Sequence, residues 1–499
     1  MKRAALLLLV AIAPVSMAAT CESLNSLKLP NVTVKATVVA AGAYRQPGAA
    51  DPKAKSAVNY SDLPAFCDVR VVSKPSADST INIEYWLPES GWNGNFLANG
   101  NGGWAGSITP GSLGDALRRG YATAMTDGGH EGGSAEFAMG HPEKVIDFGY
   151  RAVHEMATIG KALVRARYGS PARRSYWNGC SGGGRQGLME AQRYPEDFDG
   201  IVAGAPAIQT TGRSAQAVWI AQATHKSPEG ALTPAKFEAV HSAVLAACDT
   251  LDGVKDGVLE NPRKCNFDPK TIQCGGADAT NCLTAPQVET VRRIYSDVTN
   301  PRTGTVYFPG HEPGSENGWT IMAGPTGFAT GIDMFRYMVK NDPAWDYKTM
   351  NFDTDMTAAL KAGTVIDAAD PNLKKFYDRS GKIIQFHGWS DPQISPRSSV
   401  NYYEAVTKAN GGLSKVQQNH RLFMVPGMAH CGRGDGTDTF DMLTALTQWV
   451  EQNKAPESIP AARIVNGQTV RTRPLCSYPA TAQYKGTGST DDAANFTCK

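Results

Sequence analysis

Neither sign of charge dominates this sequence, and that absence bears on its partners. The 499 residues carry 49 lysines and arginines against 47 aspartates and glutamates, a formal net charge of +2. With no basic stripe and no acidic tail, nothing in the charge pattern predicts binding to nucleic acid. The chain also lacks internal repeats and low-complexity linkers.

The sequence has no long apolar run beyond its first residues. Met1, Lys2 and Arg3 give a basic start, residues 4–14 are almost wholly apolar, and the chain then reads Ser-Met-Ala-Ala over 16–19. This pattern predicts a secretory signal peptide over residues 1–19, too short to span a membrane permanently. We therefore expect a soluble mature protein, secreted or periplasmic, with no membrane partner.

The chain is too long for one compact core, so we expect one large domain with an insertion, or two domains. Its 51 glycines and 30 prolines predict many turns and ordered loops. Apolar strands alternate with helical patterns; the expected strands are 81–88, 94–100, 121–127, 198–206, 382–388 and 421–426. The alternation stops near residue 207 and resumes at 382.

This pattern predicts a doubly wound, mostly parallel sheet with helices on both faces, an α/β fold. We predict a main domain of residues 20–207 and 379–499, rich in β-structure over 20–80, and an inserted domain of residues 208–378.

The most informative stretch follows an apolar, aromatic run and contains Gly179-x-Ser181-x-Gly183, with a helix-like segment after it. In that context G-x-S-x-G predicts a nucleophile elbow, where serine occupies a strained turn and small residues let strand and helix approach. The motif alone is weak evidence, because glycine-rich chains produce it by chance.

Two further polar residues follow expected strands, where sites form in doubly wound sheets. Asp391 follows the 382–388 strand and His430 follows the last expected strand. The chain order Ser181, Asp391, His430 is that of α/β-hydrolases. We expect His430 to take the proton of the Ser181 hydroxyl, and Asp391 to orient the imidazole.

The oxyanion of such a reaction needs backbone donors. We expect them from Gly182, the residue after the serine, and from Gly102 or Gly103. Among alternatives, Asp391 stands before a proline and is also explained as a turn former. His130 is a rival catalytic histidine, although its early position breaks the chain order. His387 is interpreted as structural.

Ten cysteines in an exported chain predict five disulfides, whose pairing spacing alone does not fix. Cys180 precedes Ser181 and Cys431 follows His430, so contact between serine and histidine would bring these cysteines together; we predict a Cys180–Cys431 bridge. Free buried thiols are the alternative. The other plausible pairs are Cys21–Cys67, Cys248–Cys265, Cys274–Cys282 and Cys476–Cys498.

Several motifs together resemble the tannase and feruloyl esterase family, which includes fungal tannases, feruloyl esterases and bacterial mono(2-hydroxyethyl) terephthalate hydrolase. They are Gly-Cys-Ser-Gly-Gly-Gly-Arg-Gln-Gly at 179–187, His-Gly-Trp-Ser-Asp-Pro at 387–392 and Pro-Gly-Met-Ala-His-Cys at 426–431. The similarity continues through 99–103 and 126–130 and covers most of the mature chain. It implies an α/β-hydrolase core with an inserted lid, the Ser181, Asp391 and His430 triad, and the Cys180–Cys431 bridge.

Residues 249–258, in the loop between Cys248 and Cys265, carry three carboxylates among Asp-Gly turns. Hard oxygen ligands of this kind suit Ca²⁺, although the spacing is not that of an EF-hand and solvated turns are the alternative. The resemblance implies a structural calcium site in the lid, and no organic cofactor is expected. The implied ligands are the carboxylates of Asp249, Asp252 and Asp256 and the carbonyls of Val254 and Val258.

Substrate choice is the least determined feature. Ile394 is expected to face the pocket from the turn after Asp391, and Arg336 is a candidate for binding a carboxylate. Aromatic side chains of the insertion either line an aryl pocket or form the core of the lid. They are Trp319, Phe328, Phe335 and Trp345.

We therefore predict a serine esterase acting on small esters of aromatic carboxylic acids, of the feruloyl, galloyl or mono(2-hydroxyethyl) terephthalate type. Two alternatives come from other classes. One is a hydrolase such as a peptidase on the same core, and the other is a catalytically inactive, calcium-dependent binding protein.

Overall fold

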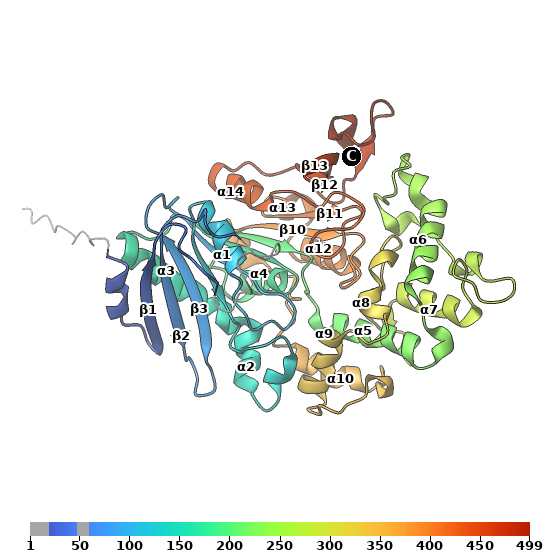
Figure 1. Ribbon diagram of the computed structural model, residues 1–499, viewed down its shortest axis with the longest axis horizontal. Helices are drawn as coiled ribbons and strands as arrows, with labels where there is room; N and C mark the ends of the chain where they lie inside the picture. Colours follow the sequence, from blue (N-terminus) through green and yellow to red (C-terminus); the bar gives the residue numbers. More distant parts are fainter. Residues whose placement is uncertain (1–18, 47–58) are drawn as a thin grey trace, which may run out of the picture.

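The computed structural model describes residues 19–46 and 59–499 (Figure 1). Of the predicted signal peptide, only Ala19 lies within the described residues. Among these residues, none of the helices combines the length and the apolar character needed to cross a membrane.

A nine-stranded sheet forms the centre of the molecule, in the order β1-β2-β3-β5-β4-β6-β7-β10-β11. β1, β2 and β3 are antiparallel to their neighbours, and the remaining strands are parallel. The β-rich N-terminal region thus extends the main sheet. The strands are β1 Val32–Val39, β2 Phe66–Ser73, β3 Ile81–Pro88, β4 Phe96–Asn99, β5 Ala122–Thr126, β6 Ser175–Cys180, β7 Gly200–Gly204, β10 Lys382–Gly388 and β11 His420–Val425.

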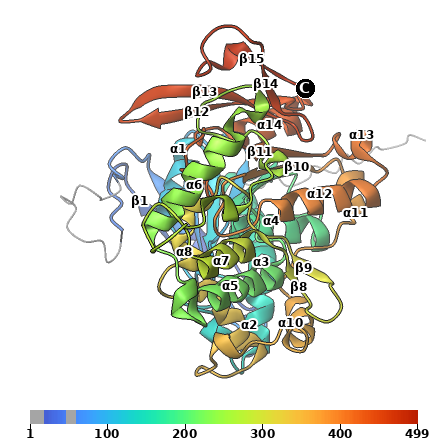
Figure 2. The same cartoon turned by 90° about the vertical axis from the view of Figure 1, so that its right-hand side faces the viewer.

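Helices cover both faces of this sheet, as predicted (Figures 1 and 2). Successive strand residues point to opposite faces, so Trp177 belongs to one core and Tyr176 to the other. The first core includes residues of α3, α4 and α12, and the second includes residues of α1 and α14. These helices are α1 Pro110–Arg118, α3 Ala152–Tyr168, α4 Gly182–Arg193, α12 Arg397–Ala409 and α14 Met442–Gln452.

The inserted residues lie between β7 and β10 and are mainly helical, with a core of their own. That core draws its members from residues 207–359 and from Ile394. Ala368, Leu373 and Phe376 instead pack with the core of the main sheet. The separate lid core therefore ends before the predicted insertion does. The lid helices are α5 Thr210–His225, α6 Pro234–Cys248, α7 Ala285–Tyr295, α8 Thr320–Ala323, α9 Ala329–Asp333 and α10 Asp355–Gly363.

The remaining elements are short or lie at the C-terminus. The last strands form two hairpins, β12 with β13 and β14 with β15, which lie beside the end of α6 in Figure 2. The bounds are α2 Pro142–Ile146, α11 Lys374–Asp378, α13 Leu413–Val416, β8 Val298–Thr299, β9 Val306–Phe308, β12 Ser458–Val465, β13 Gln468–Cys476, β14 Ala482–Tyr484 and β15 Phe496–Cys498.

The structure contains the five predicted disulfides and, among the residues that it describes, no free cysteine. The pairs are Cys21–Cys67, Cys180–Cys431, Cys248–Cys265, Cys274–Cys282 and Cys476–Cys498.

Candidate functional site

Ser181 occupies the turn between β6 and α4, with φ 63° and ψ −119°. This left-handed conformation is strained for a residue with a side chain and is held by its surroundings. A Cβ on Gly179 would lie 2.6 Å from the carbonyl carbon of Gly183, and one on Gly183 would lie 3.0 Å from the Cα of Gly100. Glycine is therefore required on both sides of Ser181, for the reason that the motif predicted.

Asp391 lies fully buried in the turn after β10 and accepts four hydrogen bonds. Its Oδ2 is 2.6 Å from Nδ1 of His430 and 3.0 Å from Nε2 of His387. Its Oδ1 accepts from the backbone N–H groups of Gln393, at 2.7 Å, and Ile394, at 3.0 Å. Burial raises the pKa of this carboxyl, but the charges and hydrogen bonds of His430 and His387 outweigh burial and hold the pKa well below its usual range.

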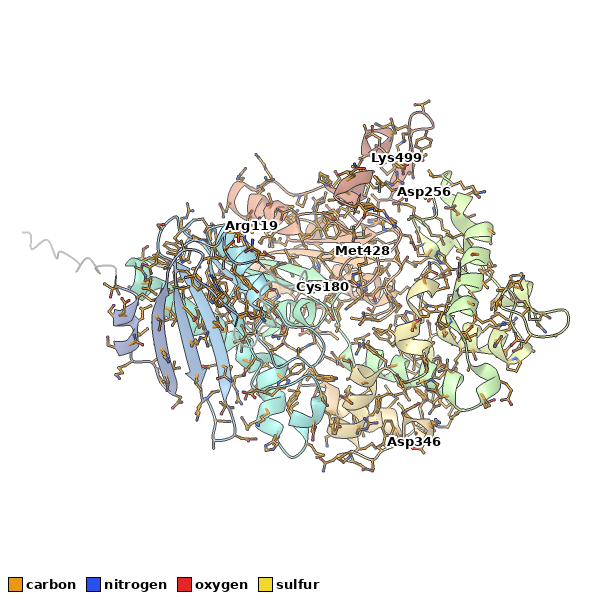
Figure 3. The ribbon with its side chains drawn as sticks, in the orientation of Figure 1. Arg119, Cys180, Asp256, Asp346, Met428 and Lys499 are labelled. Atoms are coloured by element: carbon orange, nitrogen blue, oxygen red, sulfur yellow. A yellow bond between two sulfur atoms is a disulfide. The ribbon has the colours of Figure 1, made fainter. Side chains whose placement is uncertain are left out.

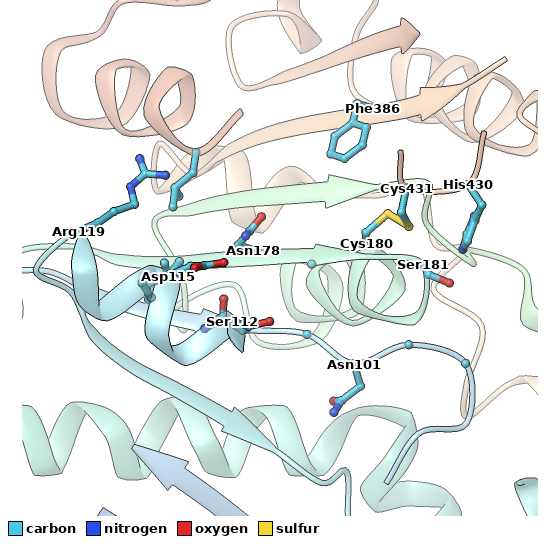
Figure 4. Close-up of a pocket in the computed structure, with 18 of the residues that line it drawn as sticks. Asn101, Ser112, Asp115, Arg119, Asn178, Cys180, Ser181, Phe386, His430 and Cys431 are labelled. Carbon is cyan, nitrogen blue, oxygen red and sulfur yellow. A yellow bond between two sulfur atoms is a disulfide. The ribbon is translucent and has the colours of Figure 1, made fainter. Parts of the chain in front are cut away.

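His430 and Ser181 line the same cavity, and the imidazole ring of His430 points toward Ser181 (Figure 4). The Cys180–Cys431 disulfide joins the residues directly before the serine and directly after the histidine, with a Cα–Cα distance of 6.1 Å. It links segments separated by 251 residues of sequence. Serine, histidine and aspartate are thus brought together at the carboxyl ends of β6, β10 and β11.

Removal of this disulfide tests its part in the site. We expect Cys180→Ser/Cys431→Ser to lose about 2–5 kcal/mol in the free energy of unfolding. Esterase activity should fall at least about tenfold, since displacing catalytic groups by ~1 Å can cost ~100-fold. Thermal unfolding and kcat/KM measure the two effects. Cys274→Ser/Cys282→Ser, in the lid, is the matched control; equal activity losses in both variants would contradict a local role.

The expected oxyanion donors lie next to one another. Gly182 is the first residue of α4, where backbone N–H groups have no partner within the helix. A Cβ built on Gly182 would lie 3.4 Å from the backbone nitrogen of Gly103, which has φ 53°. Gly102 and Gly103 both border the cavity at Ser181. This places two backbone N–H groups, those of Gly182 and Gly103, beside the serine.

Two cavities meet at Ser181. The first, here called the inner pocket, has a volume of about 20 Å³ and lies between the sheet edge and the lid. Its walls combine aromatic rings with two buried arginines. The inner pocket is lined by Gly103, Trp104, Phe148, Ser181, Gly182, Arg185, Ala207, Thr210, Arg213, Thr330 and Ile394.

The second cavity, here called the outer groove, has a volume of about 590 Å³. It runs from Ser181 and His430 along the face of the sheet toward Arg119, the residue that follows α1 (Figure 4). Ser181 and Gly103 border both cavities, whereas His430 borders only the outer groove.

Of the predicted pocket residues, the structure brings only Ile394 to Ser181. Trp319 is fully buried in the lid core, where its Nε1 donates to Ser315, so its expected place in the pocket is corrected. Phe328 lies under the guanidinium of Arg213, 4.4 Å from ring centre to Cζ, and lines neither cavity. Arg336 also lines neither cavity; its Nη1 is 3.6 Å from Asp333.

The other two aromatic residues of the insertion pack against each other. The rings of Phe335 and Trp345 are stacked, with their centres 5.8 Å apart. Both belong to the lid core or pack against it. For these residues the core interpretation is the one that the structure supports.

Sequence reasoning missed the arginines of the inner pocket. Arg185 donates to the carbonyls of Phe148, Gly149 and Ile366, so its guanidinium joins core and lid. Arg213 is buried, and burial lowers its pKa to about 10, so it keeps its charge at neutral pH. The Arg185 position was visible in the 179–187 motif; nothing in the sequence marked Arg213.

The other two histidines that the sequence analysis considered, His387 and His130, have contacts that explain them. His387 is fully buried between Asp391 and Ser399, whose Oγ is 2.8 Å from its Nδ1, so it supports Asp391. The Nε2 of His130 is 2.7 Å from the carbonyl oxygen of Trp104, and its ring stacks on Phe137. His130 lines neither cavity and is no rival to His430.

The expected calcium loop follows α6. Burial raises the pKa values of Asp252 and Asp256, and the charge of Asp249 raises both further, a repulsion that a cation would relieve. The donor set therefore suits Ca²⁺ chemically. The three carboxylates are not yet gathered around one point. Among the described residues, Asp249, Asp252 and Asp256 do not form a group whose ligand atoms all lie within 4.8 Å of one another.

The loop also has other stabilising contacts. Asp256 forms an ion pair with Arg473 of β13, near the C-terminal end of the chain in Figure 3. Asp252 accepts from the N–H of Val254 at 2.9 Å, and Asp249 from that of Gly257 at 3.1 Å. Binding of Ca²⁺ by all three carboxylates would require the loop to contract.

The fold, with serine, histidine and aspartate at the ends of parallel strands, defines the class as an α/β hydrolase. Comparisons with known proteins then give the family. The family model described as tannase and feruloyl esterase matches residues 67–499. The chain therefore belongs to the tannase and feruloyl esterase family and is a carboxylic ester hydrolase.

Relatives and solved structures agree with this assignment. The chain is 41% identical to an uncharacterised esterase of Xanthomonas campestris, over 97% of this chain and 92% of that protein. It is 37% identical to a probable feruloyl esterase B-1 of Aspergillus terreus, over 96% of this chain and 94% of that protein. The crystal structure of feruloyl esterase B from Aspergillus oryzae superposes with a TM-score of 0.89 at 33% identity, covering 96% of this chain and 99% of that one.

Proposed function

We propose that the protein is a secreted or periplasmic serine esterase that hydrolyses esters of aromatic carboxylic acids through an acyl-enzyme. The observation that carries this proposal is the meeting of Ser181, His430 and buried Asp391 beside a pocket walled by Trp104 and Phe148. Five disulfides and the predicted signal peptide support export.

The reaction begins when His430 takes the proton of Ser181 and the serine oxygen attacks the ester carbonyl carbon. The N–H groups of Gly182 and Gly103 stabilise the oxyanion. His430 then gives its proton to the departing alkoxide, which leaves as the alcohol. Water, deprotonated by His430, attacks the acyl-enzyme and releases the acid with the serine hydroxyl restored. Asp391 stabilises the imidazolium in both halves.

The inner pocket is the site proposed for the acyl group. Aromatic rings stack well on aromatic side chains, and Arg213 supplies a buried cation for a polar substituent on the ring. An aryl acyl group is larger than the pocket's volume of about 20 Å³, so its lining must widen on binding. The walls of the pocket come from both lid and core.

A small panel of esters tests the proposal. Methyl ferulate, methyl gallate, mono(2-hydroxyethyl) terephthalate and a short aliphatic nitrophenyl ester should separate the acyl classes, and we expect at least one aryl ester to be the best substrate. Turnover of the nitrophenyl ester alone would reject the aryl pocket. Faster cleavage of the matching aryl amide would favour a peptidase. Failure of a fluorophosphonate probe to label Ser181 would favour an inactive binding protein.

We also propose that the 249–258 loop binds a structural Ca²⁺ through Asp249, Asp252 and Asp256 and the carbonyls of Val254 and Val258. The buried, mutually repelling carboxylates support this. Such an ion would stiffen the lid and take no part in the chemistry.

Calcium removal gives the test. We expect dialysis against a chelator to lower the Tm by about 2–5 °C, and added Ca²⁺ to restore it, because a ligand that binds only the folded state stabilises it. Asp252→Asn should abolish the Ca²⁺-dependent shift, whereas Asp342→Asn, in an exposed turn, should keep it. A wild-type Tm that changes neither on chelation nor on addition of Ca²⁺ would contradict the proposed calcium site.

A further inference from the structure

Three side chains of the kind that bind metals meet between α3 and α4, away from Ser181. They are His154 of α3, Glu190 of α4 and Asp197, in the segment that follows α4. One imidazole nitrogen and one oxygen from each carboxylate all lie within 4.8 Å of one another. None of the three residues borders the inner pocket or the outer groove. This cluster is therefore separate from the site of the triad.

Glu190 is the member of the cluster that lacks partners. The residue is 1% exposed, yet neither of its carboxylate oxygens has a hydrogen-bond partner among residues 19–46 and 59–499. Burying a carboxylate without hydrogen bonds is costly, so buried carboxylates are normally paired or coordinate a metal. Burial, with the negative charge of Asp197, raises the pKa of Glu190 well above its usual range. A cation held between the two carboxylates would relieve both the burial and the repulsion.

His154 and Asp197 already face each other as two ligands would. Nδ1 of His154 is 2.6 Å from Oδ2 of Asp197, and the imidazole ring stacks on Tyr194 with the ring centres 3.8 Å apart. This stacking fixes the plane of the imidazole. The side chain of His154 is partly exposed, so one side of the cluster lies at the surface. Lys161, whose Nζ is 3.6 Å from Oδ1 of Asp197, is also partly exposed and has a flexible stem that lets it turn outward.

We propose that His154, Glu190 and Asp197 bind one Zn²⁺ ion that joins α3 to the end of α4. Zinc takes histidine nitrogen and carboxylate oxygen at about 2.0–2.2 Å, and three protein ligands leave the fourth position to water. Ca²⁺ and Mg²⁺ take oxygen ligands, so the histidine favours a transition metal over them. At these bond lengths tetrahedral ligand atoms lie about 3.3–3.6 Å apart, so His154 and Asp197 need to separate by only about 1 Å.

The position of the cluster on α4 decides what the ion would do. Glu190 lies about 12 Å along the helix axis from Gly182, the residue next to the nucleophile. An ion at Glu190 is therefore too distant to touch an ester at Ser181. Its expected effect is to stabilise the folded chain by tying two helices together, and the proposal does not depend on the esterase function.

Zinc binding by the purified protein, prepared without an affinity tag, provides the test. The protein is freed of metals with a chelator and returned to buffer containing Ca²⁺, so that any calcium site is already filled. We expect calorimetric titration with Zn²⁺ to show binding that depends on the cluster. At a free Zn²⁺ concentration about 100 times the Kd, the Tm should rise by about 2–3 °C. The same concentration of Mg²⁺ should leave the Tm unchanged.

Variants locate the ion. His154→Ala and Glu190→Gln should each weaken zinc binding at least about tenfold, since each removes one of three ligands. His141→Ala is the matched control and should bind zinc as the wild type does. It removes an exposed histidine whose Nδ1 is 3.1 Å from Asp78, a pair that belongs to no cluster of three such groups in the described part of the chain.

Far-ultraviolet spectra and thermal unfolding before zinc is added establish that each variant is folded. His154 is partly exposed, so His154→Ala keeps the test available if Glu190→Gln does not fold. Absence of zinc binding by the wild type would overturn the proposal, as would equal binding by wild type and folded His154→Ala. A rise in Tm with Mg²⁺ as large as that with Zn²⁺ would overturn the assignment to zinc.

Discussion

Ser181→Ala should lower kcat for the best aryl ester by about 10⁵-fold or more, the size of effect seen when a nucleophilic serine is removed from a triad. The reason is that the variant has no atom to form the acyl-enzyme. Initial rates with purified wild type and variant measure the effect, and the panel ester with the highest kcat/KM is the substrate to use.

The same substitution should leave the fold intact. The Ser181 hydroxyl accepts no capping hydrogen bond from the first turn of α4. The backbone N–H of Ser181 donates to the carbonyl of Gly204 at 2.9 Å, and alanine retains this bond. We expect an unchanged far-ultraviolet spectrum and a Tm close to that of the wild type. Activity near the wild-type level would refute the assignment of Ser181 as nucleophile.

Asp391→Asn is expected to cost about 10⁴-fold in kcat, because an amide that donates to His430 holds the imidazole in the wrong tautomer. The geometry here makes the effect severe. Both oxygens of Asp391 already accept two hydrogen bonds each, from His430 and His387 on one side and from two backbone N–H groups on the other. An asparagine NH₂ group must therefore face a donor wherever it is placed.

The pH dependence of kcat separates the loss of catalysis in Asp391→Asn from a loss of the folded structure. In the wild type the carboxyl stays charged across the working range, since its pKa lies far below its usual value. Its contribution to stability is present at neutral pH and is lost only as pH falls through that low pKa. Asp342→Asn serves as control. If Asp391→Asn were folded and fully active, the proposed role of Asp391 would be wrong.

The location of the candidate site could be read from local sequence. Gly179-x-Ser181-x-Gly183 marks a turn that only glycine neighbours permit, and the structure shows the close approaches that require them. Asp391 and His430 each follow an apolar strand, and parallel strands bring their carboxyl ends to one edge. Cys180 and Cys431 supplied an independent long-range constraint, which the structure contains.

The cavities could not be read in this way. Trp319 and Arg213 are both lid residues of a kind that often lines pockets. Trp319, however, lies in the lid core, whereas Arg213 lines the inner pocket at Ser181. Which of the two occurs depends on how α5 and α8 pack against each other and against the sheet edge. No local pattern encodes that packing.

The sequence by itself therefore determined the alternation of strands and helices, the chemical groups at the strand ends and the Cys180–Cys431 pair, because each depends on local patterns or on residues next to the predicted site. Only the tertiary structure decided that two cavities meet at Ser181 and that His430 faces one of them. It also left Asn178 uncovered on a central strand. These features arise where lid, sheet and helices distant in sequence come together, so the cavities depend on their packing.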